Sequence, residues 1–183
     1  MTDHKNDRAR RTFIRNTSLA AAGFFIVPRH VLGRGYVAPS DKLNIAGIGA
    51  GGKGASDLRE FAKSPKVNIV ALCDVDDRQA ADSVKRFGNA KYYKDFLEML
   101  DKEGKSIDAV SISTPDHTHA VATLAAMQLG KHVYTQKPLT HNIYEARLLA
   151  EAAKKYRVVT QMGNQYASAE AVRRAKELVD AGM

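Results

Sequence analysis

A glycine-rich segment between apolar residues, residues 42–56, most constrains how this chain can fold. Its sequence, Lys-Leu-Asn-Ile-Ala-Gly-Ile-Gly-Ala-Gly-Gly-Lys-Gly-Ala-Ser, predicts a short buried strand, a tight turn and the start of a helix. Two overlapping G-x-G-x-x-G registers are present, Gly47/Gly49/Gly52 and Gly49/Gly51/Gly54. The second is favoured because it leaves the apolar residues 43–48 for the strand. In that register Gly49 makes the turn, Gly51 lets the backbone approach a pyrophosphate, and Gly54 lets the helix pack closely on the strand.

A second predicted strand ends on an acid. Residues 67–74, Val-Asn-Ile-Val-Ala-Leu-Cys-Asp, are mostly apolar up to Asp74, which lies 20 residues after Gly54. A carboxylate at this spacing can accept hydrogen bonds from the ribose hydroxyls of adenosine, and it repels the 2′-phosphate of NADP. The alternative for Asp74 is a solvated turn residue at a strand end. Together with the glycines, Asp74 favours an NAD site over an NADP site. Gly52 is a further candidate contact for the cofactor.

Other nucleotide and metal motifs do not fit. Residues 47–53 match G-x-x-x-x-G-K, but Gly54 stands where a P-loop needs Ser or Thr to hold magnesium. The Tyr-x-x-x-Lys pair of short-chain dehydrogenases is absent from the sequence. Asp116, His117 and His119 are crowded on one predicted loop with no distant partner motif, so no metal site is predicted.

Residues 1–40 are predicted to be an export leader and linker. Arg10-Arg11 precedes a mostly apolar, uncharged run, residues 19–27, in the order of a twin-arginine signal. Nine residues are too few to span a bilayer, which takes roughly 20. The leader carries seven Lys/Arg and two Asp/Glu and the remainder 21 and 18, so most of the net charge of +8 lies in the leader. We therefore expect a periplasmic or exported protein that meets the twin-arginine export machinery, with no nucleic-acid partner. A basic tail with an apolar patch is the alternative.

Strand and helix patterns alternate after residue 41, which predicts an α/β fold with a doubly wound, mainly parallel sheet. Phe96, Leu97 and Leu100 are expected to face inward from one of the helices. Strands are predicted at residues 43–48, 67–74, 91–93, 107–113, 132–135 and 157–161, and helices at 55–62, 77–87, 95–102, 119–130, 142–156 and 168–181. Polar motifs follow several strands, at 114–119, 136–138 and 163–165. Ligands bind beyond the carboxyl ends of strands in such sheets, so these motifs predict one site.

From residue 42 onward, the order and spacing of the motifs resemble those of the Gfo/Idh/MocA oxidoreductase family. The resemblance rests on the glycines, on Asp74, on Ser113-Thr-Pro-x-x-x-His119 and on Gly130-Lys-His-Val-Tyr-x-x-Lys-Pro138. It implies a Rossmann domain that binds NAD(P), followed by an open-faced sheet domain. It also implies hydride transfer between the nicotinamide and a hydroxyl or carbonyl of a sugar or cyclitol.

The resemblance also assigns residue roles. Lys137 matches the lysine of the family's Glu-Lys-Pro motif, beside nicotinamide and substrate, and is the predicted catalytic residue; a turn lysine is the alternative. Lys137 and Pro138 are both expected to contact the cofactor. This chain has Gln136 in place of the glutamate, and losing that anion should make charged Lys137 less favoured.

A second loop is implied to pass the cofactor. Thr114 and Pro115 match residues of that loop, and His119 matches its histidine at a helix start. A capping or core role for His119 is an equal alternative. Asn164 and Gln165 follow the last predicted strand, where the family's chain nears the substrate.

The chain ends about where the family's second domain begins. We expect a Rossmann domain over 41–162 and the start of a truncated substrate domain over 163–183, with the second α+β domain missing. A homo-oligomer would require that domain, and catalysis by this chain alone would be poor. Two other functions stay open: an NAD-assisted glycoside hydrolase or lyase, and a non-catalytic nucleotide-binding module.

Overall fold

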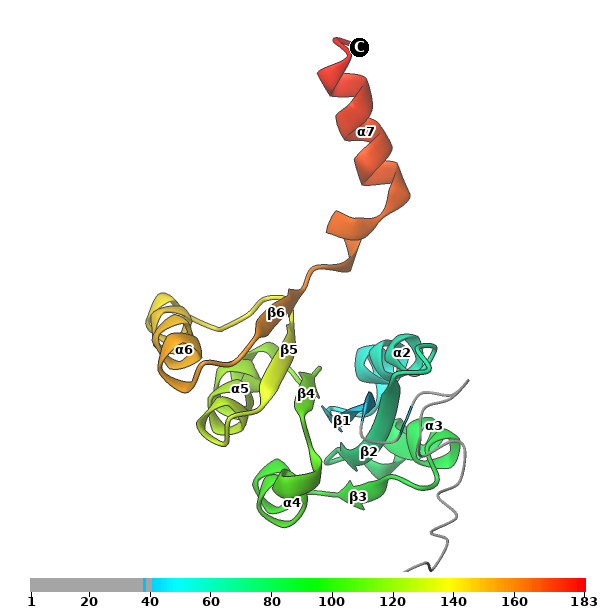
Figure 1. Cartoon of the computed structure of the whole chain (residues 1–183), viewed down its shortest axis with the longest axis vertical. Coiled ribbons are helices and arrows are strands. Elements are labelled where there is room, and N and C mark those ends of the chain that lie inside the picture. The colour runs from blue at the N-terminus through cyan, green and yellow to red at the C-terminus, as the bar shows by residue number, and fades with distance from the viewer. Residues whose placement is uncertain (1–37, 39–40) are drawn as a thin grey trace, which may run out of the picture. The chain divides into compact units, whose positions relative to one another are not determined.

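The structure is a computed structural model that describes Ala38 and residues 41–183. Residues 41–183 form one compact unit, in which strands and helices alternate (Figure 1). The strands are β1 (Leu43–Ile48), β2 (Val67–Cys73), β3 (Lys91–Tyr93), β4 (Ala109–Ile112), β5 (His132–Gln136) and β6 (Thr160–Gly163). The α-helices are α2 (Gly52–Phe61), α3 (Asp77–Arg86), α4 (Phe96–Glu103), α5 (His119–Gln128), α6 (Ile143–Tyr156) and α7 (Glu170–Asp180). The 3-10 helices are Gly104–Ser106, Asp116–Thr118 and Gln165–Ser168.

All six strands form one parallel sheet in the order β3-β2-β1-β4-β5-β6. The chain builds outward from β1 in one direction and then from β4 in the other, which confirms the predicted doubly wound sheet. Ile48 lies in register with Cys73 of β2 and Ile112 of β4. The segments that follow these strands, beginning at Gly49 and Asp74, therefore emerge side by side at the reversal point, where such sheets bind ligands.

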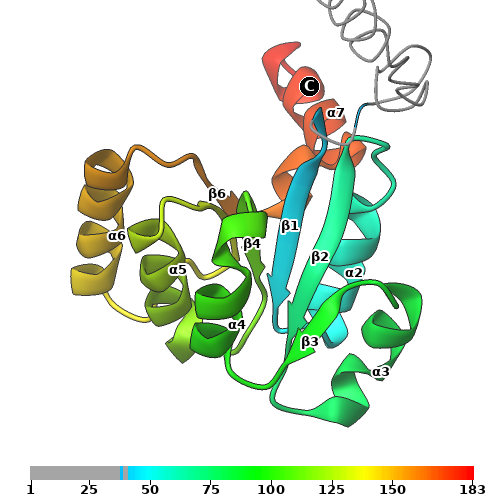
Figure 2. The ribbon, with the colours of Figure 1, turned by 60° about the horizontal axis from the view of Figure 1, so that its bottom comes forward.

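Helices cover both faces of the sheet (Figure 2). Helices α2 and α3 pack on one face, where Leu58 and Leu72 lie in a small core. Helices α4, α5 and α6 cover the other face over a larger core that includes Met99, Ile112 and Met127. The sheet is thus closed on both sides, and its carboxyl-terminal edge is the place where ligand-binding segments can collect.

Three of the helices in the described part of the chain begin with a side-chain cap. Asp76, Asp95 and Asn142 each precede a helix and accept a hydrogen bond from a backbone N–H in its first turn. Helix α6 ends at Arg157, which has a left-handed backbone and a φ of 54°. Caps of this kind stabilise helix ends by satisfying main-chain groups that have no partner within the helix.

Two local predictions need correction. Leu97 is 55% exposed, and Met99 takes the inward place because residues 96, 99 and 100 share one face of α4. The last strand is not 157–161 but β6, because Arg157 still belongs to the end of α6. The last predicted helix, 168–181, is confirmed as α7, whose residues are all outside the core; only Ser168 belongs to the preceding 3-10 helix.

The predicted export leader, residues 1–40, lies outside the described residues apart from Ala38. Within the described part of the chain, the helices are all too short or too polar to cross a membrane.

Candidate functional site

The turn after β1 can be made only by glycines at two positions. Gly49 has a φ of +80°, and a Cβ added to it would lie 2.6 Å from the carbonyl oxygen of Ser113. A Cβ on Gly54 would lie 1.7 Å from the carbonyl oxygen of Gly49. Helix α2 therefore packs directly on the turn, as the Gly49/Gly51/Gly54 register predicts.

Gly51 lies between the turn and Asp74. Its backbone N–H donates to Oδ2 of Asp74 at 3.0 Å, and Oδ1 of the same carboxylate accepts from the N–H of Asp76 at 3.0 Å. A Cβ on Gly51 would lie 2.7 Å from Cβ of Gln79, so packing against α3 also requires glycine here. That second requirement was not foreseen from the sequence. A carboxylate has about four acceptor positions, so Asp74 keeps acceptor capacity for a ligand hydroxyl.

The first turn of α2 carries nothing that would repel an anion. Gly51 precedes the helix without a capping side chain, and the first turn has no acidic residue. The unpaired N–H groups and the positive end of the helix dipole make such a terminus suitable for a phosphate. Gly52, with a φ of +46°, is the first helical residue and lines the pocket described next.

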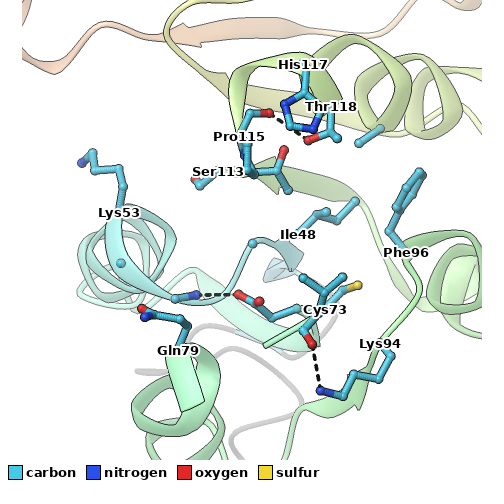
Figure 3. A pocket seen from close by; sticks show the side chains of 17 residues that line it. Ile48, Lys53, Cys73, Gln79, Lys94, Phe96, Ser113, Pro115, His117 and Thr118 are labelled. Atoms are coloured by element: carbon cyan, nitrogen blue, oxygen red, sulfur yellow. Dashed lines mark hydrogen bonds between the residues drawn. The ribbon is translucent and has the colours of Figure 1, made fainter. Parts of the chain in front are cut away.

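A pocket of about 600 Å³ opens at the carboxyl ends of β1, β2 and β4. In Figure 3, Ser113, Pro115, His117 and Thr118 lie across the pocket from Gln79 and Lys94. Its lining includes six of the predicted cofactor-binding residues: Gly49, Gly51, Gly52, Asp74, Thr114 and Pro115. The pocket thus gathers residues from three strand ends.

The wall near Asp74 combines an apolar surface with a held cation. Val75 is 83% exposed and lines the pocket, a position where a flat apolar ring can pack. Lys94 Nζ lies 2.5 Å from Asp77 and 3.2 Å from the carbonyl of Val75. The hydrogen bond to Asp77 raises the pKa of Lys94, which keeps this lysine charged. Sequence reasoning missed Lys94, which lies on a segment without a recognisable motif.

The loop after β4 presents a buried hydroxyl with no partner. Thr114 lines the pocket, and its Oγ1 has no hydrogen-bond partner among the described residues although it is shielded from solvent. The next turn is closed by Thr118, whose hydroxyl donates to the carbonyl of Pro115 at 2.8 Å. An orphan hydroxyl is costly unless a ligand satisfies it, so this feature fits a bound group.

His119 connects two loops and does not line the pocket. It is 1% exposed; Nδ1 lies 2.6 Å from the carbonyl oxygen of Pro138, and Nε2 lies 2.8 Å from that of Thr114. The ring is buried and joins the loops after β4 and β5, which agrees with the core alternative. The direct contact with the cofactor stays a prediction.

Lys137 and Pro138 also lie outside the pocket lining. Both residues are exposed, and their peptide bond is cis. No hydrogen bond or ion pair of the Lys137 ammonium occurs within the described part of the chain. Gln136 just before it is 4% exposed, and its Nε2 donates to Oδ2 of Asp57 at 2.6 Å. Asp57 is a second residue that no motif singled out.

Cys73 lies beside Asp74 in the pocket lining but is not reactive. Burial, followed by the charge of Asp74, raises the pKa of its thiol to about 12. The thiolate is the nucleophilic form, so this cysteine acts as a small buried apolar residue. Among residues 38 and 41–183, no group of three acidic, His or Cys side chains is placed to hold a metal ion.

The fold and the site together define a dinucleotide-binding α/β domain. Four features indicate this class: the strand order, the glycine turn, the acid at the end of β2 and the uncapped start of α2. The chain belongs to the Gfo/Idh/MocA oxidoreductase family, whose NAD-binding Rossmann-fold domain matches residues 43–164. The family suggested by the motifs is therefore confirmed.

Individual relatives carry different enzyme names. The chain is 28% identical over 148 residues to a levoglucosan dehydrogenase of Pseudarthrobacter phenanthrenivorans, covering 76% of this chain and 37% of the relative. It is 30% identical over 142 residues to scyllo-inositol 2-dehydrogenase (NAD(+)) of Bacillus subtilis, covering 77% and 41%. It is also 30% identical over 156 residues to a glycosyl hydrolase family 109 protein of Shewanella baltica, covering 76% and 33%.

Solved structures share the fold over the same region. GenD2 from gentamicin A biosynthesis, in complex with NAD, has a TM-score of 0.70 at 29% identity, covering 84% of this chain and 41% of that one. Myo-inositol 2-dehydrogenase from Lactobacillus plantarum has a TM-score of 0.70 at 31% identity, covering 77% and 42%. The chain thus spans between 33% and 42% of the length of these proteins.

Proposed function

We propose that this chain is the NAD-binding part of an oxidoreductase that transfers hydride between nicotinamide and a hydroxyl or carbonyl of a sugar or cyclitol. One observation carries the proposal: the glycine turn, the uncapped start of α2 and Asp74 lie together at one pocket. Glycines at 49, 51 and 54 would admit the pyrophosphate, and Asp74 would accept from the adenosine ribose. The bound nicotinamide would supply the hydride acceptor.

The protein's own side chains prepare the rest of the reaction. Thr114 Oγ1 would gain a partner on ligand binding, and Pro115 would limit the space beside the nicotinamide. Lys137 would orient the reacting oxygen or move a proton at Nζ as hydride leaves the adjacent carbon. We assign His119 a positioning role, because it holds the carbonyls of Thr114 and Pro138 rather than the ligand.

We further propose that residues 1–40 direct export by the twin-arginine pathway to the periplasm. Support comes from the order of Arg10-Arg11 and the apolar run at 19–27. Such export carries folded proteins, which suits a domain that acquires its nucleotide before export. Replacing both arginines with lysine and following the protein by cell fractionation tests this proposal. Unchanged export in that variant would refute it.

Nucleotide binding is the first test. We expect calorimetric titration of the 183-residue chain to give an affinity for NAD at least about tenfold higher than for NADP, because Asp74 repels the 2′-phosphate. Asp74→Ala should weaken NAD binding by roughly tenfold or more through loss of a charge-assisted hydrogen bond. The same substitution should also reduce the ratio of the affinity for NAD to the affinity for NADP. Asp82→Ala, at an exposed carboxylate of α3 outside the pocket, is the control. Equal affinities for both nucleotides in the parent protein would contradict the NAD assignment.

Turnover separates the oxidoreductase from its alternatives. With NAD and a panel of free sugars and cyclitols, net NADH formation followed by absorbance is the expected result for a dehydrogenase. Lys137→Ala should lower that rate by roughly 10²–10⁴ while leaving NAD affinity unchanged. Lys105→Ala, at another exposed lysine, is the control. Sugar release from glycosides without net NADH would favour the hydrolase, which the family 109 relative supports. NAD binding with neither activity would favour a non-catalytic module.

A further inference from the structure

A buried carboxylate lies under the site and has no role in the proposed reaction. Asp57 of α2 is only 4% exposed, although it is an acid. Three donors satisfy it: Lys53 Nζ at 2.5 Å, Gln136 Nε2 at 2.6 Å and Ser113 Oγ at 3.2 Å. A buried charge is tolerated only when it is paired and hydrogen-bonded, so all three contacts are needed to keep this carboxylate buried.

The three donors come from three different parts of the site. Lys53 lies in the first turn of α2, directly after the glycines, and lines the pocket. Ser113 follows β4, lines the same pocket and is the first residue of the loop that contains Thr114. Gln136 ends β5 and immediately precedes Lys137. One carboxylate therefore joins the glycine-loop helix to the ends of β4 and β5.

The chemistry of Asp57 determines which side chain fits at position 136. A carboxylate only accepts hydrogen bonds, whereas an amide can donate through its nitrogen. Glutamate at 136 would place two buried carboxylates within about hydrogen-bond distance, and such a pair cannot both ionise without a large penalty. Glutamine removes that conflict and supplies the donor.

The backbone of Gly163 in β6 packs against the side-chain amide of Gln136. A Cβ added to Gly163 would lie 2.8 Å from Cδ and 2.8 Å from Nε2 of Gln136. The amide is therefore held between α2 and β6, with its nitrogen on Asp57. Lys137, the first residue after β5, is exposed, whereas Gln136 is buried.

We propose that Asp57 and Gln136 are a matched pair in which Asp57 is the positioning residue for the loops that carry Thr114 and Lys137. Gln136 stands where the resembled Glu-Lys-Pro motif has glutamate, and it donates to the carboxylate of Asp57. The consequence for binding and turnover rests on the proposed function, whereas the pairing itself is testable without any ligand.

A double-mutant cycle tests the pair. We expect Gln136→Glu to lower the thermal unfolding midpoint by roughly 5–15 °C, because it removes the donor and opposes two carboxylates. Asp57→Asn should lower the midpoint by a smaller amount, since the amide oxygen of asparagine can still accept a hydrogen bond from Gln136. The double variant Asp57→Asn/Gln136→Glu exchanges donor and acceptor and should recover at least about half of the loss seen in Gln136→Glu.

Two further readouts distinguish positioning from bulk stability. Amide hydrogen exchange of residues 113–119 and 137–140 should accelerate by roughly tenfold or more in Gln136→Glu and slow again in the double variant. The dissociation constant for NAD should likewise increase in Gln136→Glu and decrease again in the double variant. Glu60→Gln is the matched control. It breaks the ion pair between Glu60 of the same helix and Lys63, whose side chains are 63% and 71% exposed, and it should change neither quantity measurably.

The outcomes that overturn the pairing differ from those that overturn NAD binding. Additive midpoint changes in the cycle would refute the matched pair, whether or not NAD binds. A rescued midpoint in a protein that binds no NAD would support the pair and refute the proposed function. If Gln136→Glu does not fold, the double variant decides: its failure to fold, while Asp57→Asn folds, would also refute the pair.

Discussion

Gly54→Ala is expected to abolish measurable NAD binding, with a loss of affinity of at least about 100-fold. The added Cβ would lie 1.7 Å from the carbonyl oxygen of Gly49, far inside contact distance, and its next contact is also backbone. Relief therefore requires α2 to move away from the turn, which displaces the helix start that would meet the pyrophosphate. Overpacking of this kind also destabilises by about 1–3 kcal/mol or more. Calorimetric titration with NAD and urea unfolding measure the two effects.

The control for that variant is Gly104→Ala. Gly104 follows α4 with a helical backbone, φ −51° and ψ −34°, and a Cβ there would meet no atom within 4 Å. Alanine should leave NAD affinity unchanged and raise stability slightly, because it restricts the unfolded chain. Normal NAD binding by Gly54→Ala would show that the pyrophosphate does not depend on this helix–turn contact.

His119→Ala should reduce the free energy of unfolding by about 2–4 kcal/mol. The substitution removes a ring that is 1% exposed, leaves a cavity, and removes the ring nitrogens that lie 2.6 Å from the carbonyl oxygen of Pro138 and 2.8 Å from that of Thr114. Because both carbonyls lie on strand-end loops, NAD affinity should fall as well. Urea unfolding monitored by circular dichroism gives the stability change, and titration gives the affinity.

His117→Ala provides the comparison for His119. His117 is exposed on the same turn and lines the pocket, so its removal should leave stability within about 0.5 kcal/mol. A variant of His119 as stable as that of His117 would contradict the bridging role. Loss of NAD affinity in His119→Ala without loss of stability would instead restore the direct cofactor contact.

Local sequence patterns predicted the alternating elements because each depends on neighbouring residues. Strand β1 and the glycine turn were recognisable from one short segment, and the apolar run before Asp74 identified β2. Errors arose where an element boundary depended on a few residues. Arg157 follows α6 with a left-handed backbone. Glycine or asparagine usually occupies this position, so an arginine gives no sequence signal that the helix ends there. Leu97 is as apolar as Phe96 and Leu100, and only the packing of α4 on the sheet decides which of these side chains face inward.

The sequence by itself determined the α/β class, the glycine register and the acid at the end of β2, because these follow from residue type and short spacing. The tertiary structure decided which strand ends meet and what joins them. Asp57 and Gln136 are 79 residues apart, and neither belongs to a motif that predicts the other. The two contacts of His119 likewise depend on how the loops after β4 and β5 are placed on either side of its ring. Hydrogen bonds between distant elements depend on how helices and strands pack, and local periodicity does not contain that information.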